Sequence, residues 1–170
     1  MENIHMNLSA LYTTVPAYLE YAWRTTPGAA AQSITADTNV TLTLTTEVAD
    51  TAAIGSIGSN AVTVPAGTYY FEAYTLLTGT DQRWIFGLYN GSSLLTSRSG
   101  YYSAGGAGSN VGEFTTTLSG QFVLASSGSL TLRILSAGGG SIGLTTGLPT
   151  TGDGALSIDQ RTTLQLWKVA

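Results

Sequence analysis

Few residues of this 170-residue chain are suited to acid–base chemistry. Hydrolysis of a glycan needs a pair of carboxyl groups, and the candidates are Glu72, Asp81, Glu113, Asp153 and Asp159. Glu72 stands out because it lies within a strongly aromatic stretch. A second interpretation is that Glu72 pairs with an arginine such as Arg83 or Arg133, either within one subunit or across two. The reason is that a buried carboxylate requires a partner.

Other catalytic and metal-binding arrangements find little support. His5 is the only histidine, and a Ser-His-Asp arrangement would have to use it. The chain has no cysteine, which excludes thiol catalysis and thiolate metal sites. Asp153-Gly154 and Asp159 would suit calcium, but their spacing fits no EF-hand. We therefore predict no catalytic residue, no metal, no cofactor and no enzyme activity, with glycan hydrolysis as the enzymatic alternative.

Aromatic side chains in loops offer a different chemistry, the binding of sugars. Tyr101-Tyr102 precede a glycine-rich stretch that ends near Asn110, and loops often carry function. This stretch is a candidate ligand loop, although its tyrosines would also suit an ordinary surface loop. Trp84 would form a sugar platform if its strand end were exposed, but a core position is the favoured interpretation.

Composition narrows the class of protein. Charged residues make up 9% of the chain, against roughly 25% in a typical soluble domain. The six basic residues are scattered, which argues against nucleic-acid binding. No apolar run reaches the roughly 18 residues of a spanning helix, so we expect no membrane insertion. The first six residues have no features of a signal peptide.

The segment Tyr69–Leu77 is apolar on both faces of the strand it predicts. Side chains alternate between faces, so Tyr69, Phe71 and Ala73 share one face, and Tyr70, Glu72 and Tyr74 share the other. The segment Trp84–Tyr89 repeats this pattern. A strand that is apolar on both faces needs a covering layer on its second face as well. We predict that a neighbouring subunit provides this layer, which makes the segment a subunit interface. The predicted interface residues are Tyr69, Tyr70, Phe71, Glu72, Tyr74, Trp84, Phe86 and Trp167.

The remainder of the chain reads as short strands and turns. Asn90-Gly91 is the strongest hairpin signal. The predicted strands are Asn39–Glu47, Ala61–Val64, Thr68–Leu77, Arg83–Tyr89, Ser93–Ser97, Glu113–Leu118, Gln121–Ala125, Ser129–Leu135 and Arg161–Val169. With no convincing long helix, the prediction is an all-β fold, an antiparallel jelly-roll sandwich of about 8–10 strands.

Residues 1–32 differ from the rest and are predicted to form an N-terminal arm, with the jelly-roll domain spanning residues 33–170. Tyr18–Arg24 within the arm reads as a strand. One interpretation is a first strand folded onto the domain. The other, which we adopt as the prediction, is an anchor that docks on another protein because its apolar residues would be costly to leave in water. The predicted anchor residues are Leu11, Tyr12, Val15, Tyr18, Tyr21 and Trp23.

A family resemblance lies in Leu44–Thr51 and Ile57–Ala73, where a short strand leads into Pro65-Ala66-Gly67-Thr68-Tyr69 and a long aromatic strand. Leu88–Gly91, Ser119–Leu124 and Leu164–Val169 add weaker matches. The chain from about Asn39 to Val169 resembles a jelly-roll domain of bacteriophage tail fibres and virion proteins. That domain is similar in fold to the globular heads of complement and to tumour-necrosis-factor-like proteins. The resemblance implies a compact homotrimer.

The predicted function is that of a bacteriophage virion structural protein on the particle surface, most simply a trimeric capsid decoration or cement protein held by its arm. Its partners would be its own copies and other capsid or tail proteins. The alternative is a tail-fibre or receptor-binding tip that recognises a host surface glycan through the loops around Tyr101–Asn110 and Ala137–Gly154.

Overall fold

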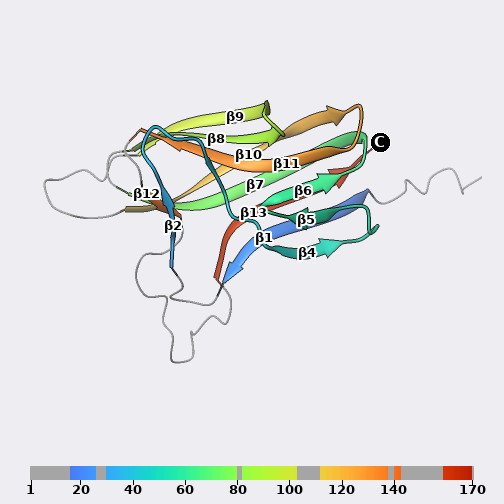
Figure 1. Cartoon of the computed structure of the whole chain (residues 1–170), viewed down its shortest axis with the longest axis horizontal. Helices are drawn as coiled ribbons and strands as arrows, with labels where there is room; N and C mark the ends of the chain where they lie inside the picture. Colours follow the sequence, from blue (N-terminus) through green and yellow to red (C-terminus); the bar gives the residue numbers. More distant parts are fainter. Residues whose placement is uncertain are drawn as a thin grey trace, which may run out of the picture.

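The chain forms two antiparallel β-sheets packed face to face (Figure 1). The computed structural model describes residues 16–25, 30–79, 82–102, 112–137, 140–142 and 159–169. Within these ranges every regular element is a strand. The all-β jelly-roll prediction is confirmed, because alternating side chains give each sheet one apolar face that must be covered.

The first sheet, sheet A, is built around β7 (Gly67–Gly79), which has β10 along one edge and β13 followed by β12 along the other. Its order is β2-β12-β7-β13-β1-β4, with β10 paired to β7. The bounds of its other strands are β1 Ala17–Thr25, β2 Gln32–Ile34, β4 Thr46–Asp50, β10 Gly112–Leu124, β12 Gly140–Ile142 and β13 Asp159–Lys168.

The second sheet, sheet B, has the order β5-β6-β11-β8-β9, with β3 paired to β11. Its strands are β3 Val40–Thr41, β5 Ser56–Gly58, β6 Ala61–Val64, β8 Gln82–Asn90, β9 Ser93–Tyr102 and β11 Gly128–Ser136. The β8–β9 hairpin confirms the Asn90-Gly91 signal. Gly91 adopts a φ of 58°, a conformation that glycine tolerates without steric cost.

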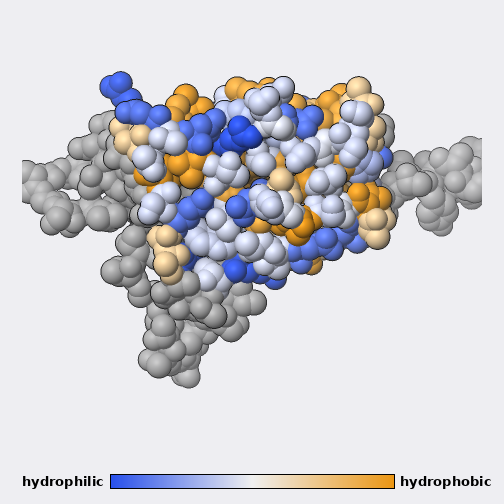
Figure 2. All heavy atoms as spheres, in the orientation of Figure 1, coloured by the Kyte–Doolittle hydropathy of each residue, from blue (hydrophilic) through white to orange (hydrophobic). Residues whose placement is uncertain are grey.

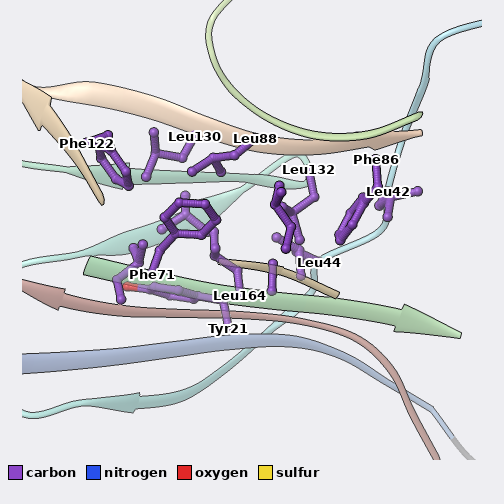
Figure 3. Packing of buried hydrophobic residues seen from close by; sticks show 14 of the residues in the cluster. Tyr21, Leu42, Leu44, Phe71, Phe86, Leu88, Phe122, Leu130, Leu132 and Leu164 are labelled. Carbon is purple, nitrogen blue, oxygen red and sulfur yellow. The ribbon is translucent and has the colours of Figure 1, made fainter. Parts of the chain in front are cut away.

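The hydrophobic core lies between the two sheets (Figure 3). Phe71 and Leu164 enter it from sheet A, and Phe86 and Leu132 enter it from sheet B; all four are fully buried. Phe122 stacks on Tyr69 with ring centroids 5.4 Å apart. Aromatic and aliphatic side chains from both layers therefore interdigitate, which accounts for one apolar face of each central strand.

Two strand predictions differ from the structure. Glu113–Leu118 and Gln121–Ala125 were expected as separate strands, but β10 runs unbroken past Gly120. A Cβ at Gly120 would lie 3.2 Å from Phe71 Cε1, so the glycine makes room for an aromatic ring rather than a turn. Asn39–Glu47 is not one strand either, because it crosses from β3 in sheet B to β4 in sheet A.

The predicted boundary at residue 32 is wrong. β1, which covers most of the predicted arm's second half, pairs with β13 over its whole length and with β4 on its other edge. The strand expected at Tyr18–Arg24 is confirmed, and it belongs to sheet A. The physical reason is that Leu19 and Tyr21 are fully buried in the core, which the first of the two interpretations of the arm anticipated.

Candidate self-association face

The outer face of sheet A carries a row of three aromatic side chains from three adjacent strands. Tyr18 of β1 is opposite Trp167 of β13, and Trp167 is opposite Tyr70 of β7. The ring centroids of Tyr18 and Trp167 are 5.3 Å apart, and those of Tyr70 and Trp167 are 5.5 Å apart. Both pairs are tilted, a favourable aromatic geometry. The three rings thus form one continuous aromatic surface.

A polar row runs beside the aromatic one on the same face. The register places Glu20, Gln165 and Glu72 opposite one another on β1, β13 and β7. The hydroxyl of Tyr18 donates a hydrogen bond of 2.6 Å to Glu20, and the hydroxyl of Tyr70 donates one of 2.9 Å to Glu72. The two rows are therefore linked at both ends by a tyrosine that donates to a carboxylate two residues later.

These carboxylates change the acidity of the tyrosines. Burial, followed by the hydrogen bond and the negative charge of Glu20, raises the pKa of Tyr18 from 10.0 to about 12. The hydrogen bond to Glu72 is the main cause that raises the pKa of Tyr70.

Exposed apolar side chains lie in a further row beside the aromatic row, on the side away from the polar row. Thr68 is opposite Val123 of β10, and the carbonyl of Thr68 accepts a 2.9 Å hydrogen bond from the amide of Val169. Val123 is 69% exposed, Val169 is 49% exposed, and Tyr70 is 40% exposed. Large apolar groups gathered on one face usually mark a binding surface rather than an ordinary wet one.

On the other side of the polar row lies a shallow hollow of about 280 Å³. Its lining includes the side chains of Glu72, Tyr74 and Gln165, together with Thr117 and Ser119 of β10. We call the aromatic row, the polar row, Val123, Val169, Tyr74 and this hollow the self-association face.

In the structure, some of the predicted interface residues lie on the outer face of their strands and others on the face that packs in the core. Tyr70, Glu72, Tyr74 and Trp167 belong to the self-association face, as the alternation of β7 requires. The prediction is wrong for Tyr69, Phe71, Phe86 and Trp84, which are buried in the core of a single chain. Their cover is the opposite sheet, and the described part of the chain places no layer over the other face of β7.

Glu72 pairs with neither Arg83 nor Arg133 in the described part of the chain. Arg133 stacks on Tyr89 with its Cζ 4.5 Å from the ring centroid and donates to Thr131. Both Arg133 and Arg83 lie in sheet B, whereas Glu72 lies on the outer face of sheet A. A partner from another subunit stays a prediction.

The predicted anchor residues that the structure describes lie in different surroundings. Tyr18 belongs to the self-association face, Tyr21 is buried in the core, and Trp23 is half-buried with the Arg161 guanidinium 5.0 Å from its ring centroid. Tyr101 and Tyr102 end β9, and no position is described for their side chains. Residues outside the described ranges are Leu11, Tyr12, Val15, Asn110, Asp81 and Asp153, together with His5.

Sequence reasoning missed Glu20, Gln165, Val123 and Val169 as members of this face. One signal was available, since Tyr18-Leu19-Glu20 and Tyr70-Phe71-Glu72 repeat the same Tyr-x-Glu spacing. Among the described residues, no three histidine, cysteine, aspartate or glutamate side chains gather as a metal site would require. No described helix has the length and apolarity to cross a bilayer.

Comparison with known proteins supports the fold. No family model matches the chain, and no relative was found among curated proteins. Murine APRIL superposes with a TM-score of 0.57 at 11% identity, covering 90% of this chain and 98% of its own. The vertex protein P5 of PRD1 gives 0.54 at 13% identity, with 92% and 99% covered.

The globular domain of the zebrafish complement 1qA protein gives a TM-score of 0.50 at 10% identity, covering 91% of this chain and 98% of its own. These matches confirm the predicted likeness in fold to complement heads, tumour-necrosis-factor-like proteins and a virion protein. At such low identity the likeness concerns the fold, and function must be argued from the face itself.

Proposed function

We propose that this chain is a structural protein of a virus particle, and that the self-association face joins copies of it into a closed homotrimer. The observation that carries the proposal is the continuous row Tyr18–Trp167–Tyr70 beside a row of two carboxylates. In such a trimer, the self-association face of one copy contacts a different surface of the next copy. A closed ring forms when the rotation that relates neighbouring copies returns to the first copy after three subunits. The fold shared with a vertex protein supports the location on a virion.

The energetics favour association through this face. The two aromatic pairs already exist within one chain, so association gains from covering the apolar surface that the rings and the exposed valines leave open, at about 25 cal/mol for each Å² covered. Glu20 and Glu72 each accept a hydrogen bond from a tyrosine of their own chain, and their negative charge favours a positively charged group on the neighbour. The carboxylates therefore select the orientation of the neighbour while the rings supply the affinity.

The role that fits best within a virion is capsid decoration, with the residues before β1 as the attachment to the particle. Since Tyr18, Tyr21 and Trp23 are part of sheet A, the attachment is assigned to residues 1–15, which include Leu11, Tyr12 and Val15. This assignment also separates attachment from trimer formation along the chain.

The test uses two variants of the full chain. Deletion of residues 1–15 should leave a trimer by analytical ultracentrifugation that no longer binds particles lacking the protein. Trp167→Ala should give a folded monomer. A truncated protein that still decorates the particles would contradict the attachment, and a wild-type monomer at micromolar concentration would contradict the trimer.

A further inference from the structure

A hollow of about 330 Å³ lies on sheet B, near the ends of β8, β9 and β11. Its floor is apolar: the register aligns Leu135, Ile85 and Ser99 in one row across these strands, and Ile85 is 43% exposed. Because Trp84 and Phe86 point into the core, this row lies on the outer face of sheet B. The complete set of described lining residues is Asp37, Arg83, Trp84, Ile85, Ser99, Gly100, Leu135 and Ala137.

Two charged residues of opposite sign border this floor, and the main chain holds both in place. The amide of Asp37 donates a 2.9 Å hydrogen bond to the carbonyl of Ser136, at the end of β11. The amide of Ala137 donates a 2.9 Å hydrogen bond to the carbonyl of Arg83. Both charged residues are exposed, and a carboxylate acceptor and a guanidinium donor are thereby positioned at one small hollow.

Asp37 adopts a strained backbone conformation. Its φ is 54°, in the left-handed region that L-residues other than glycine enter rarely, and aspartate less rarely than most. Glycine at this position would relieve the strain but would remove the carboxylate. Ala53, Ser59 and Asn60 also have a positive φ, so it is the position at the hollow that singles out Asp37.

The size and lining restrict what the hollow accepts. Its volume is at the lower end of the roughly 300–1,000 Å³ typical of small-molecule sites, which are largely apolar with a few convergent polar groups. A matching ligand carries a small apolar group, one hydrogen-bond donor for Asp37 and one acceptor for Arg83. An acetamido group has all three in its methyl, N–H and C=O.

We propose that this hollow binds the acetamido group of an N-acetylated amino sugar. The methyl contacts the aliphatic floor of Ile85 and Leu135, the N–H donates to Asp37, and the C=O accepts from Arg83. The site lies on the outer face of sheet B, whereas the self-association face is the outer face of sheet A. One chain forms the whole hollow, so sugar binding does not require the proposed trimer, and either proposal can fail without the other.

The experiment titrates the full-length protein with N-acetylglucosamine, followed by saturation-transfer NMR, with glucose as the matched sugar that lacks the acetamido group. One sugar unit with few polar contacts should bind with a Kd on the order of 1 mM. The methyl of the acetamido group should receive the strongest transfer, and glucose should bind at least about tenfold more weakly. No binding of N-acetylglucosamine at roughly 50 mM, or equal binding of glucose, overturns the proposal.

Variants locate the site. Asp37→Gly should abolish binding while the melting temperature stays the same or rises, because backbone strain is relieved. Arg83→Gln should weaken binding at least about fivefold. Glu47→Gln, which removes an exposed carboxylate of sheet A, is the matched control and should bind as wild type does. Undiminished binding by folded Asp37→Gly and Arg83→Gln proteins would overturn the proposal.

Discussion

Tyr89 on the outer face of sheet B and Tyr70 on the outer face of sheet A are the same residue type in different surroundings. Tyr89 is covered by its own chain: the Arg133 guanidinium stacks on its ring, and its hydroxyl accepts a 3.3 Å hydrogen bond from Asn39. Tyr70 instead lies at the end of a row of rings with no cation stacked on it in the described part of the chain, and is 40% exposed. A tyrosine on a strand thus indicates an interface only when its own chain leaves it uncovered.

A neighbouring glycine explains part of the contrast. A Cβ at Gly87 would lie 2.9 Å from Tyr89 Cε2, so the ring of Tyr89 lies close over the backbone at Gly87. On sheet A, the residue two positions before Tyr70 is Thr68 rather than glycine, and the hydroxyl of Tyr70 donates to Glu72, two positions after it. The side of the molecule shown in Figure 2 mixes hydrophobic and hydrophilic side chains, as expected of a water-facing surface.

The largest expected effect comes from removing the middle ring of the aromatic row. Trp167→Ala breaks both ring pairs, and a tryptophan at the centre of an interface typically contributes 2–4 kcal/mol or more, roughly 30-fold to 1,000-fold in affinity. Sedimentation equilibrium at micromolar concentration should show monomers. Tyr89→Ala on sheet B is the control, and an equal loss of association in both variants would remove the distinction between the faces.

A smaller effect is expected from reversing one charge of the polar row. Glu72→Lys loses the hydrogen bond from Tyr70 and places a cation where the neighbour must supply one. Association should weaken about 10-fold to 100-fold, because like charges at an interface repel. Glu47→Lys, elsewhere on sheet A, should leave the mass unchanged. Wild-type association of Glu72→Lys would show that this carboxylate lies outside the contact.

A substitution on sheet B should alter stability alone. Gly87→Ala forces Tyr89 and Leu94 to move, since the new Cβ would lie 2.9 Å and 3.1 Å from their atoms. The free energy of unfolding should fall by about 1–2 kcal/mol, measured by chemical denaturation, with no change in oligomer mass. A change in mass would mean that the face containing Tyr89 also contacts other copies.

The smallest effect concerns alkaline pH. The folded state raises the pKa of Tyr18 from 10.0 to about 12, so folding favours its protonated form. The resulting stabilisation is complete below pH 10 and is lost as pH rises from 10 to about 12. Tyr18→Phe should therefore flatten the decline of the melting temperature in this window. An unchanged profile would show that the ionisation of Tyr18 does not contribute to the decline.

Much of the fold was predictable because alternation and turn chemistry are local. The aromatic segment Tyr69–Leu77, the Asn90-Gly91 hairpin and the strand at Tyr18–Arg24 all appear where the pattern places them. The candidate site was half predicted: Tyr70, Glu72, Tyr74 and Trp167 lie on the self-association face, while Tyr69, Phe71, Trp84 and Phe86 lie in the core. The alternation of side chains along a strand separates these two sets of residues, but it does not determine which set faces the core.

The amino-acid sequence by itself determined the strand periodicity, the tight turns and the surplus of aromatics, because these depend on residues close together in the chain. Only the tertiary structure decided which face of β7 the opposite sheet covers, and that Tyr18, Trp167 and Tyr70 form one row. That row joins residues 18, 70 and 167 through the pairing of β1, β13 and β7. Such pairing depends on how the two sheets close around a common core, which no local pattern specifies.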